Sequence, residues 1–349
     1  MALPHAAAEG SSRLNVLVTG GLGYIGAHAC IALAEAGYRP LIVDNLSNAK
    51  PSVLDRLREL TGLPLEFHKV DIRDRNALYR AAAGKEIGAV LHFAGLKAVG
   101  ESVENPLLYY DHNVGGTISV LETMAALKIA RLIFSSSATV YGEPERLPLT
   151  EEHPLRPASP YGKTKLVAEH LLADAAHANS RFQYAALRYF NPAGAHESAR
   201  VGEDPRARPD NLFPYLARVA GGTLPKLRIF GSDYDTRDGT GVRDFIHVMD
   251  LARGHVAALK KLERHQGSFV LNLGTGRGYS VLEVVKAFER ACGAPVPHEL
   301  VARRPGDVST SFADPSRAQA ELGWSAKLDL DAMCRDAWRW QSQNPGGYP

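Results

Sequence analysis

A tyrosine and a lysine stand four positions apart near the middle of the chain, and a run of three serines precedes them. Tyr161 and Lys165 would share one face of a helix. An ammonium one turn away favours the phenolate, and so lowers a tyrosine pKa from its reference value of about 10. Ser137 ends the serine run and could hydrogen-bond the same substrate oxygen. We expect these three residues to be catalytic, as a general acid and base for the carbinol that hydride chemistry needs. The alternative is that the tyrosine and lysine are ordinary surface residues.

A glycine-rich segment near the start of the chain has the spacing of a dinucleotide-binding turn. Gly20, Gly23 and Gly26 follow the apolar run 14–19 and open a helical pattern. Glycine lets the backbone approach a pyrophosphate, and the N-terminus of a helix supplies unpaired N–H groups. Asp44 ends the next strand about 20 residues on, where a carboxylate can hold ribose hydroxyls. Because that carboxylate would also repel a 2′-phosphate, the sequence predicts NAD as the cofactor.

Other chemistries find no support in the sequence. It has no His-Glu-x-x-His pair, no Walker A lysine and no Gly-x-Ser-x-Gly elbow, and the 13 histidines lack the spacing of metal ligands, so we expect no metal site. Cys30, Cys292 and Cys334 are odd in number and far apart, which argues against disulfides and fits a reducing cytoplasm. The formal charge is +2 with no basic block, so no nucleic-acid partner is expected.

The elements that must position these residues alternate between strand and helix patterns. Strands are expected at 14–19, 40–43, 65–70, 89–93, 131–135 and 184–189, with helices between them at 24–36, 52–60, 75–83, 113–127 and 161–176. This alternation predicts an α/β fold of the Rossmann type, a doubly wound parallel sheet that binds ligands at the carboxyl ends of its strands.

The pattern changes after Asn191, where Gly, Pro and charged residues become frequent. Shorter elements are expected at 227–230, 241–250 and 269–273, and a helix at 281–292. We expect an NAD-binding Rossmann domain at 14–190 and a smaller mixed α/β substrate-binding lobe at 191–349, from which later strands can return to the first sheet. Residues 1–13 are expected to be a disordered leader. No apolar run approaches the roughly 20 residues that span a bilayer, so no membrane is expected.

Several longer motifs support a more specific interpretation. They occupy residues 19–26, 44–46, 92–102, 134–142, 159–165, 187–192, 241–251, 272–274 and 303–307. Together they resemble the extended short-chain dehydrogenase/reductases, and more narrowly the UDP-galactose (UDP-glucose) 4-epimerases. The resemblance covers about residues 14 to 348. The runs 92–102 and 241–251 are highly specific, whereas the glycine turn and Tyr-x-x-x-Lys occur across the superfamily.

The resemblance implies a cytoplasmic, homodimeric isomerase of carbohydrate and galactose metabolism that acts on a nucleotide sugar. NAD would stay bound and be regenerated in each cycle. Tyr161 would take the proton from the sugar 4-hydroxyl, Ser137 would help steer it, and Lys165 would also hold the nicotinamide ribose. The residues that match NAD contacts in the family are Gly20, Gly23, Tyr24, Ile25, Gly26, Asp44, Asn45, Asp71, Ile72, Phe93, Ala94, Lys97, Asn113 and Phe190. Those that match UDP-sugar contacts are Asn191, Asn211, Leu212, Arg243, Arg304, Asp307 and Ser311.

Physical chemistry supports part of this set. The two arginines, Arg243 and Arg304, suit a pyrophosphate, and Asp307 suits a ribose hydroxyl. In the family, the position four residues beyond Asp307 lies beside the sugar 2-position, and there this chain has the small Ser311. A small residue leaves room for an acetamido group, so we expect UDP-GlcNAc and UDP-GalNAc to be substrates as well as UDP-glucose and UDP-galactose.

Two alternatives remain. A nucleotide-sugar 4,6-dehydratase needs an extra acid, which the related family places just after the catalytic serine or threonine; here Ala138 and Thr139 stand at those positions. A non-catalytic NAD-sensing protein would be expected to lose Tyr161 or Lys165, and this chain keeps both.

Overall fold

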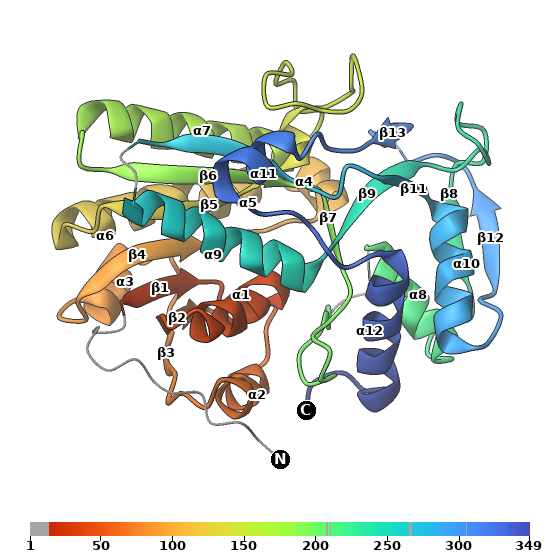
Figure 1. Ribbon diagram of the computed structural model, residues 1–349, viewed down its shortest axis with the longest axis horizontal. Coiled ribbons are helices and arrows are strands. Elements are labelled where there is room, and N and C mark those ends of the chain that lie inside the picture. The colour runs from red at the N-terminus through yellow and green to blue at the C-terminus, as the bar shows by residue number, and fades with distance from the viewer. Residues whose placement is uncertain (1–13, 207–208, 210, 265–266, 305) are drawn as a thin grey trace.

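The computed structural model describes residues 14–206, 209, 211–264, 267–304 and 306–349 (Figure 1). The leader expected at 1–13 therefore lies outside the described residues. Among the helices of the described ranges, none is both long enough and apolar enough to cross a membrane.

The first lobe is built on a parallel sheet. Its strands are β1 (Asn15–Thr19), β2 (Arg39–Asp44), β3 (Glu66–Lys69), β4 (Ile87–His92), β5 (Arg131–Ser137), β6 (Gln183–Tyr189) and β10 (Phe269–Leu273). In the part of the chain that is described, their order is β10-β6-β5-β4-β1-β2-β3, and every neighbouring pair is parallel. The order reverses between β1 and β4, which places a crevice at the carboxyl ends of these strands. The predicted fold class is confirmed.

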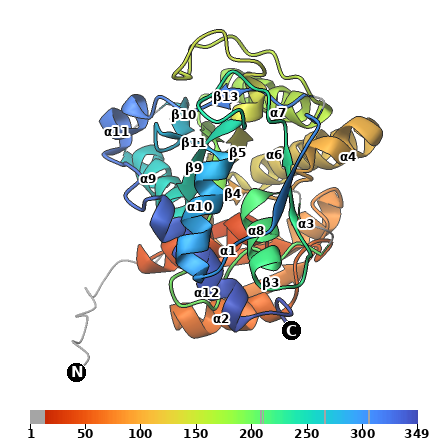
Figure 2. The same cartoon turned by 90° about the vertical axis from the view of Figure 1, so that its right-hand side faces the viewer.

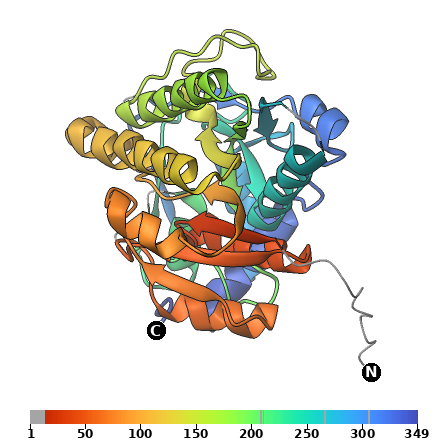
Figure 3. The ribbon, with the colours of Figure 1, turned by 90° about the vertical axis from the view of Figure 1, so that its left-hand side faces the viewer.

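Helices cover both faces of the sheet (Figures 1 and 3). One layer holds α1 (Tyr24–Glu35), α2 (Ser52–Thr61) and α9 (Val248–Arg264). The other holds α3 (Arg75–Ala82), α6 (Gly116–Leu127) and α7 (Pro160–Ala178). The short helices α4 (Val99–Glu104) and α5 (Pro106–Tyr109) run into a π-helical segment, η1 (Tyr110–Gly115), which leads into α6. The sequence prediction missed α4 and α5, which are too short for a clear period.

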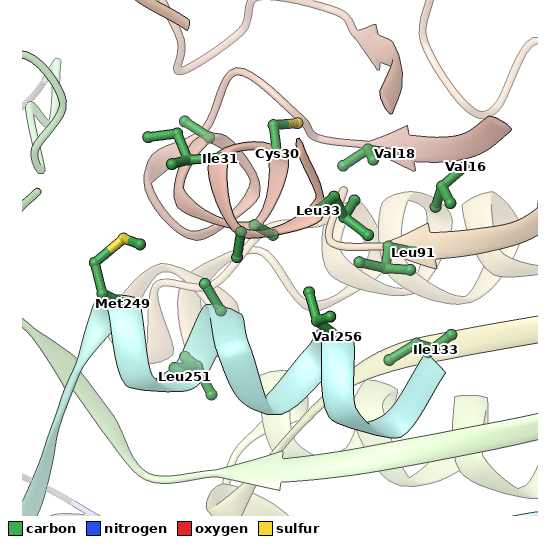
Figure 4. Close-up of a cluster of buried hydrophobic side chains, with 14 of the residues drawn as sticks. Val16, Val18, Cys30, Ile31, Leu33, Leu91, Ile133, Met249, Leu251 and Val256 are labelled. Carbon is green, nitrogen blue, oxygen red and sulfur yellow. The ribbon is translucent and has the colours of Figure 1, made fainter. Parts of the chain in front are cut away.

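The contact of α1 with α9 forms one of the cores (Figure 4). Val18 of β1 and Leu91 of β4 point from the sheet toward Leu33 of α1, and Leu251 and Val256 approach from α9. The three leucines and Val18 are at most 1% exposed. Burial of each such side chain contributes roughly 1.5–3 kcal/mol, so α9 is an integral part of the first lobe although it follows residue 190 in the chain.

The second lobe contains smaller sheets and three packed helices (Figure 2). One sheet holds β7 (Asn191–Ala193), β9 (Val242–His247), β11 (Gly278–Ser280) and β13 (Thr310–Ser311), and β8 (Leu227–Phe230) pairs with β12 (His298–Val301). The helices are α8 (Leu212–Ala220), α10 (Val281–Cys292) and α12 (Leu330–Gln343), and they share a buried cluster. Helix α11 (Ser316–Leu322) packs near β10, and a 3-10 turn, η2 (Ala138–Val140), follows β5.

The prediction that one element spans residues 241–250 is wrong. The strand β9 ends at His247, and the long helix α9 begins at Val248. The backbone N–H of Met249 donates to Nδ1 of His247 (3.1 Å), which supports the helix start. The apolar run continues across the junction because both elements are buried, so hydrophobicity alone could not locate it.

Candidate active site

The start of helix α7 and the end of strand β5 bring the predicted catalytic residues together. Ser159 caps α7, because its hydroxyl accepts a hydrogen bond from the Gly162 N–H (3.2 Å). The helix lies directly on the turn after Ser137, since a Cβ at Gly162 would stand 2.8 Å from the Thr139 carbonyl oxygen. Tyr161 therefore lies in the first turn of α7, beside Ser137.

The Tyr161 phenol is half-buried and hydrogen-bonded to Ser137. Burial raises the pKa of Tyr161 above 10.0, and the hydrogen bond to Ser137 lowers it in part. The sequence argument that Lys165 lowers this pKa is wrong for the chain by itself. The Lys165 amino nitrogen lies 5.9 Å from the centroid of the Tyr161 ring and donates instead to the Ser135 carbonyl oxygen (2.9 Å). The chain's own groups thus keep the phenol protonated.

Lys165, on helix α7, is buried against the end of strand β5. It is 6% exposed, and its amino nitrogen lies 5.0 Å from the centroid of the Phe134 ring. Burial lowers the pKa of Lys165 to about 8, and the nearby Glu169 carboxylate opposes that change. The amino group is therefore less basic than that of an exposed lysine.

The glycine turn packs too tightly for side chains. Gly20 has a φ of +69°, and a Cβ there would stand 2.7 Å from the Ala94 nitrogen. A Cβ at Gly26 would lie 2.2 Å from the Gly20 carbonyl oxygen. Helix α1 follows Gly23 with no side-chain cap and no acidic residue in its first turn. No side chain of α1 itself therefore caps its first-turn N–H groups, which leaves them available to an anion.

Asp44 lies at the end of strand β2, next to this turn. It is 8% exposed and accepts hydrogen bonds from the Leu46 N–H (2.8 Å) and the Leu22 N–H (3.2 Å). Burial raises the pKa of Asp44, and these hydrogen bonds oppose the rise. A carboxylate has about four acceptor sites, so it retains capacity for ribose hydroxyls.

Residues after strand β3 line the same edge of the sheet. Asn45 donates to Asp71 (3.1 Å), and the Arg73 guanidinium holds the pKa of the Asp71 carboxyl well below its usual range. Ile72 is buried under Gly116, where a Cβ would stand 2.5 Å from its Cδ1. Asp71 and Ile72 are thus fixed in place, as the adenine end of a dinucleotide site would need.

The loop after strand β4 is tied to the catalytic helix. Asn113 is 4% exposed, exchanges hydrogen bonds with the backbone of Leu96 (2.8 and 3.0 Å) and donates to the Thr164 hydroxyl (3.0 Å). Its amide is therefore occupied within the chain and positions the loop. Ala94 donates its N–H to the Thr19 carbonyl oxygen (3.1 Å), at the end of β1.

The remaining predicted cofactor residues lie around the crevice. Tyr24 donates its hydroxyl to the Gly194 carbonyl oxygen (2.7 Å), which links α1 to the second lobe. Ile25 packs on the α1–α9 core, and so does Phe93, whose ring centroid lies 4.8 Å from that of His255. Phe190, directly after β6, is 6% exposed.

Four of the predicted substrate residues gather at the second lobe. Arg243 of β9 donates to the Val308 carbonyl oxygen (2.7 Å), and Arg304 pairs with Asp307 (2.9 Å). Ser311 of β13 is the register partner of Arg243. Because parallel strands in register direct paired side chains to one face, Arg243 and Ser311 share a face of this small sheet. Asp307 and Arg304 are among the charged groups that act on Arg243, so the four residues form one cluster in the second lobe.

The other three predicted substrate residues are also placed. Asn191 is exposed and pairs in register with Phe245 of β9. Leu212 is the first residue of α8 and is half-buried. Asn211 precedes it and donates to the Glu203 carboxylate (2.7 Å).

The sequence prediction missed Glu203. One carboxylate oxygen of this residue accepts from Lys97 (2.9 Å) and from Asn211 (2.7 Å), and so joins a predicted cofactor residue to a predicted substrate residue. Its side chain is 9% exposed. An acidic residue in a Gly- and Pro-rich segment carries no spacing signal, and only the tertiary contacts identify Glu203.

Similarity to known proteins agrees with this geometry. The model of the family described as GDP-mannose 4,6 dehydratase matches residues 17–337. A UDP-glucose 4-epimerase of Bacillus subtilis (strain 168) is 55% identical over 333 residues, which are 95% of this chain and 98% of that protein.

Solved structures show the same likeness. A UDP-glucose 4-epimerase from Stenotrophomonas maltophila, with bound NAD and formylated UDP-arabinopyranose, superposes with a TM-score of 0.93 at 51% identity and covers 96% of this chain and 99% of that one. A UDP-glucose 4-epimerase from Bifidobacterium longum, in complex with NAD+ and UDP, gives a TM-score of 0.93 at 50% identity and covers 96% and 100%. The predicted resemblance is confirmed, and the chain belongs to the UDP-glucose 4-epimerase family, within the extended short-chain dehydrogenase/reductases.

Proposed function

We propose that this chain is an NAD-dependent isomerase that interconverts UDP-glucose and UDP-galactose. The proposal is supported by the similarity to UDP-glucose 4-epimerases, one of them solved with NAD+ and UDP, and by three groups of residues in this chain. These are the Ser137–Tyr161 pair with Lys165, the glycine turn, and the Arg243, Arg304 and Asp307 cluster. We assign residues 14–190 to NAD and residues 191–349 to the UDP-sugar, with α9 and β10 packed onto the first lobe.

The residues of the first lobe fit NAD. The turn at Gly20 and Gly26 leaves no room for a Cβ, and the uncapped start of α1 offers N–H groups to a pyrophosphate. The Asp44 carboxylate suits ribose hydroxyls and disfavours a 2′-phosphate. NAD, when bound, supplies a reversible acceptor for the hydride of a carbinol carbon.

The chain's own residues move the proton and hold the sugar. Tyr161 takes the proton from the sugar 4-hydroxyl and returns it when the opposite face of C4 is reduced, while Ser137 holds the same oxygen. Lys165 donates to the Ser135 carbonyl oxygen and would also hold the nicotinamide ribose. Arg243 and Arg304 hold the diphosphate, so the sugar can present its other face without leaving the site.

A nucleotide-sugar 4,6-dehydratase is the second candidate, because the matching family model carries that description. Elimination of water needs an acid near the catalytic serine. In this chain the next side chains are Ala138 and Thr139, and the Thr139 hydroxyl donates to Ser137 (3.0 Å). The site thus offers no carboxyl group at those two positions.

The experiment that separates these functions is incubation of the purified protein with UDP-galactose. Formation of UDP-glucose with no change in mass supports epimerisation. A product lighter by one water would establish the dehydratase, and an unchanged substrate with bound NAD would favour a sensing protein.

We further propose that the substrate range includes UDP-N-acetylhexosamines. Ser311 is half-buried and lies opposite Arg243 in the register of β13 and β9, so it belongs to the wall nearest the proposed diphosphate site. A serine leaves volume there that an aromatic ring would fill.

We also propose a homodimer in a reducing, cytoplasmic setting. Val103 of α4, Leu107 and Leu108 of α5 and Ile118 of α6 are exposed apolar residues on consecutive helices, and Leu107 is 82% exposed. Such a patch on one side of the first lobe fits a second copy of the chain. The three cysteines are free thiols. Sedimentation of Leu107→Glu should show a lighter species than the parent; an unchanged mass would contradict this interface.

A further inference from the structure

The hydroxyl of Tyr234 is a buried polar group without a partner. Tyr234 lies in the loop between β8 and β9, is 6% exposed, and its hydroxyl makes no hydrogen bond within the described chain. A buried hydroxyl left unpaired costs roughly 1–3 kcal/mol, and such groups are few in native proteins. Its presence therefore calls for an explanation.

The fold holds this ring firmly in place. Gly231 has a φ of +85°, and a Cβ there would stand 2.3 Å from Cε2 of Tyr234. The Arg303 guanidinium stacks on one face of the Tyr234 ring, with its central carbon 4.1 Å from the ring centroid. The Tyr234 N–H also donates to the Gly239 carbonyl oxygen (3.0 Å). Because backbone and ring are both fixed, the hydroxyl cannot turn outward to find water.

The surroundings of the hydroxyl are those of the proposed nucleotide site. Arg304 follows Arg303 in the chain and lies over the Phe230 ring at the end of β8, with its guanidinium carbon 4.6 Å from the ring centroid. The charged groups that act on the Tyr234 phenol include Asp307, Arg243, Arg303 and Arg304. Burial, followed by the Asp307 charge, raises the pKa of Tyr234, so the phenol keeps its proton and is a donor. The neighbouring Asp307 carboxylate pairs with Arg304 (2.9 Å) and does not accept from the Tyr234 hydroxyl.

We propose that the Tyr234 hydroxyl donates a hydrogen bond to the diphosphate of the UDP-sugar, between Arg243 and Arg304. This inference rests on the proposed function. Phosphate oxygens are acceptors only, and they fit a site where two guanidinium groups and one phenol all donate. The cost of the unpaired hydroxyl is then present in the free enzyme and removed on binding, which favours the complex.

The test is Tyr234→Phe in the NAD-loaded enzyme, with UDP as the probe. Removal of an unpaired hydroxyl should leave the melting temperature without UDP unchanged or higher. The Kd for UDP should rise roughly tenfold, as expected for one lost hydrogen bond to a charged group. The KM for UDP-galactose should rise with it, while NAD content and kcat stay near the parental values.

A matched control is Tyr38→Phe. The Tyr38 hydroxyl donates to Glu263 (2.7 Å) in the first lobe, so this variant should lose stability and keep the parental Kd for UDP. If Tyr234→Phe binds UDP as the parent does, or melts lower without UDP, the inference is wrong. If the parent itself fails to bind UDP, both this inference and the proposed function are wrong, so the two failures can be told apart.

Discussion

The contact between Gly26 and the Gly20 carbonyl oxygen gives a quantitative test of the dinucleotide site. A Cβ added at Gly26 would stand 2.2 Å from that oxygen, whereas ordinary contacts begin at 3.4 Å. The first turn of α1 and the glycine turn must therefore separate by about 1 Å in Gly26→Ala. Overpacking of this kind costs about 1–3 kcal/mol. If that cost falls on cofactor binding, NAD affinity drops roughly 5- to 150-fold.

Two matched variants, in which the added Cβ makes a weaker contact or none, test whether the loss of NAD follows the severity of the contact. At Gly23 the added Cβ would lie 3.3 Å from the same Gly20 oxygen, so Gly23→Ala should lose little NAD. At Gly100, on helix α4, no heavy atom lies within 4 Å of the added Cβ, and Gly100→Ala should behave as the parent. NAD retained after gel filtration is measured by release from denatured protein, and the melting temperature reports stability separately.

The expected order of NAD retention is parent and Gly100→Ala first, then Gly23→Ala, and Gly26→Ala last. A folded Gly26→Ala that retains NAD as fully as the parent would refute the view that this turn holds the dinucleotide. A greater loss in Gly23→Ala than in Gly26→Ala would refute the distance argument itself.

Three further predictions follow from the site and its surroundings. Tyr161→Phe removes the proposed base and keeps the ring, so turnover of UDP-galactose should fall by roughly 10²–10⁴ with NAD still bound; near-parental turnover would mean that another group takes the proton. Ser311→Tyr should remove activity on UDP-GlcNAc and keep activity on UDP-galactose, and a parent inactive on UDP-GlcNAc would contradict the proposed range. Burial lowers the pKa of His28 from 6.5 to about 3, while Nδ1 donates to the Tyr24 carbonyl oxygen (2.6 Å) and Nε2 has no partner within the described chain. Because the folded-state pKa of His28 lies below its unfolded-state pKa, the stability that depends on neutral His28 is complete above pH 6.5. It declines as pH falls toward 3, by about 1.4 kcal/mol per pH unit. Urea midpoints of His28→Asn should therefore fall less between pH 6.5 and 5 than those of the parent or of the exposed-site control His177→Asn, and equal slopes would contradict the assignment.

The first half of the fold could be predicted because its information is local. Strands β1 to β6 and most of their helices lie within a few residues of the predicted ranges, since apolar runs and turn residues mark them directly. Strand β10 is different. Its residues 269–273 were recognised as an element, yet its place beside β6 depends on a pairing between distant segments that no local pattern records.

The site residues, too, could be predicted only where their sequence signal is local. Gly20 and Gly26 follow the first strand closely, and Tyr161 stands four positions before Lys165, so their types and spacing mark them. Glu203 and Tyr234 have no such spacing. The contact of Glu203 with Lys97 arises only when the two lobes meet, and the unpaired hydroxyl of Tyr234 is visible only once burial is known.

The protonation of Tyr161 links the two halves of the site. The chain alone keeps the phenol neutral, because burial outweighs the hydrogen bond to Ser137 and the Lys165 nitrogen is directed to a backbone carbonyl. A neutral phenol cannot accept a proton, so a further positive charge close to the hydroxyl is needed before Tyr161 can act as a base. Oxidised NAD carries that charge on its nicotinamide ring. In the proposed function, Tyr161 would therefore act as the base when oxidised NAD is bound, which would couple removal of the proton to the presence of the hydride acceptor.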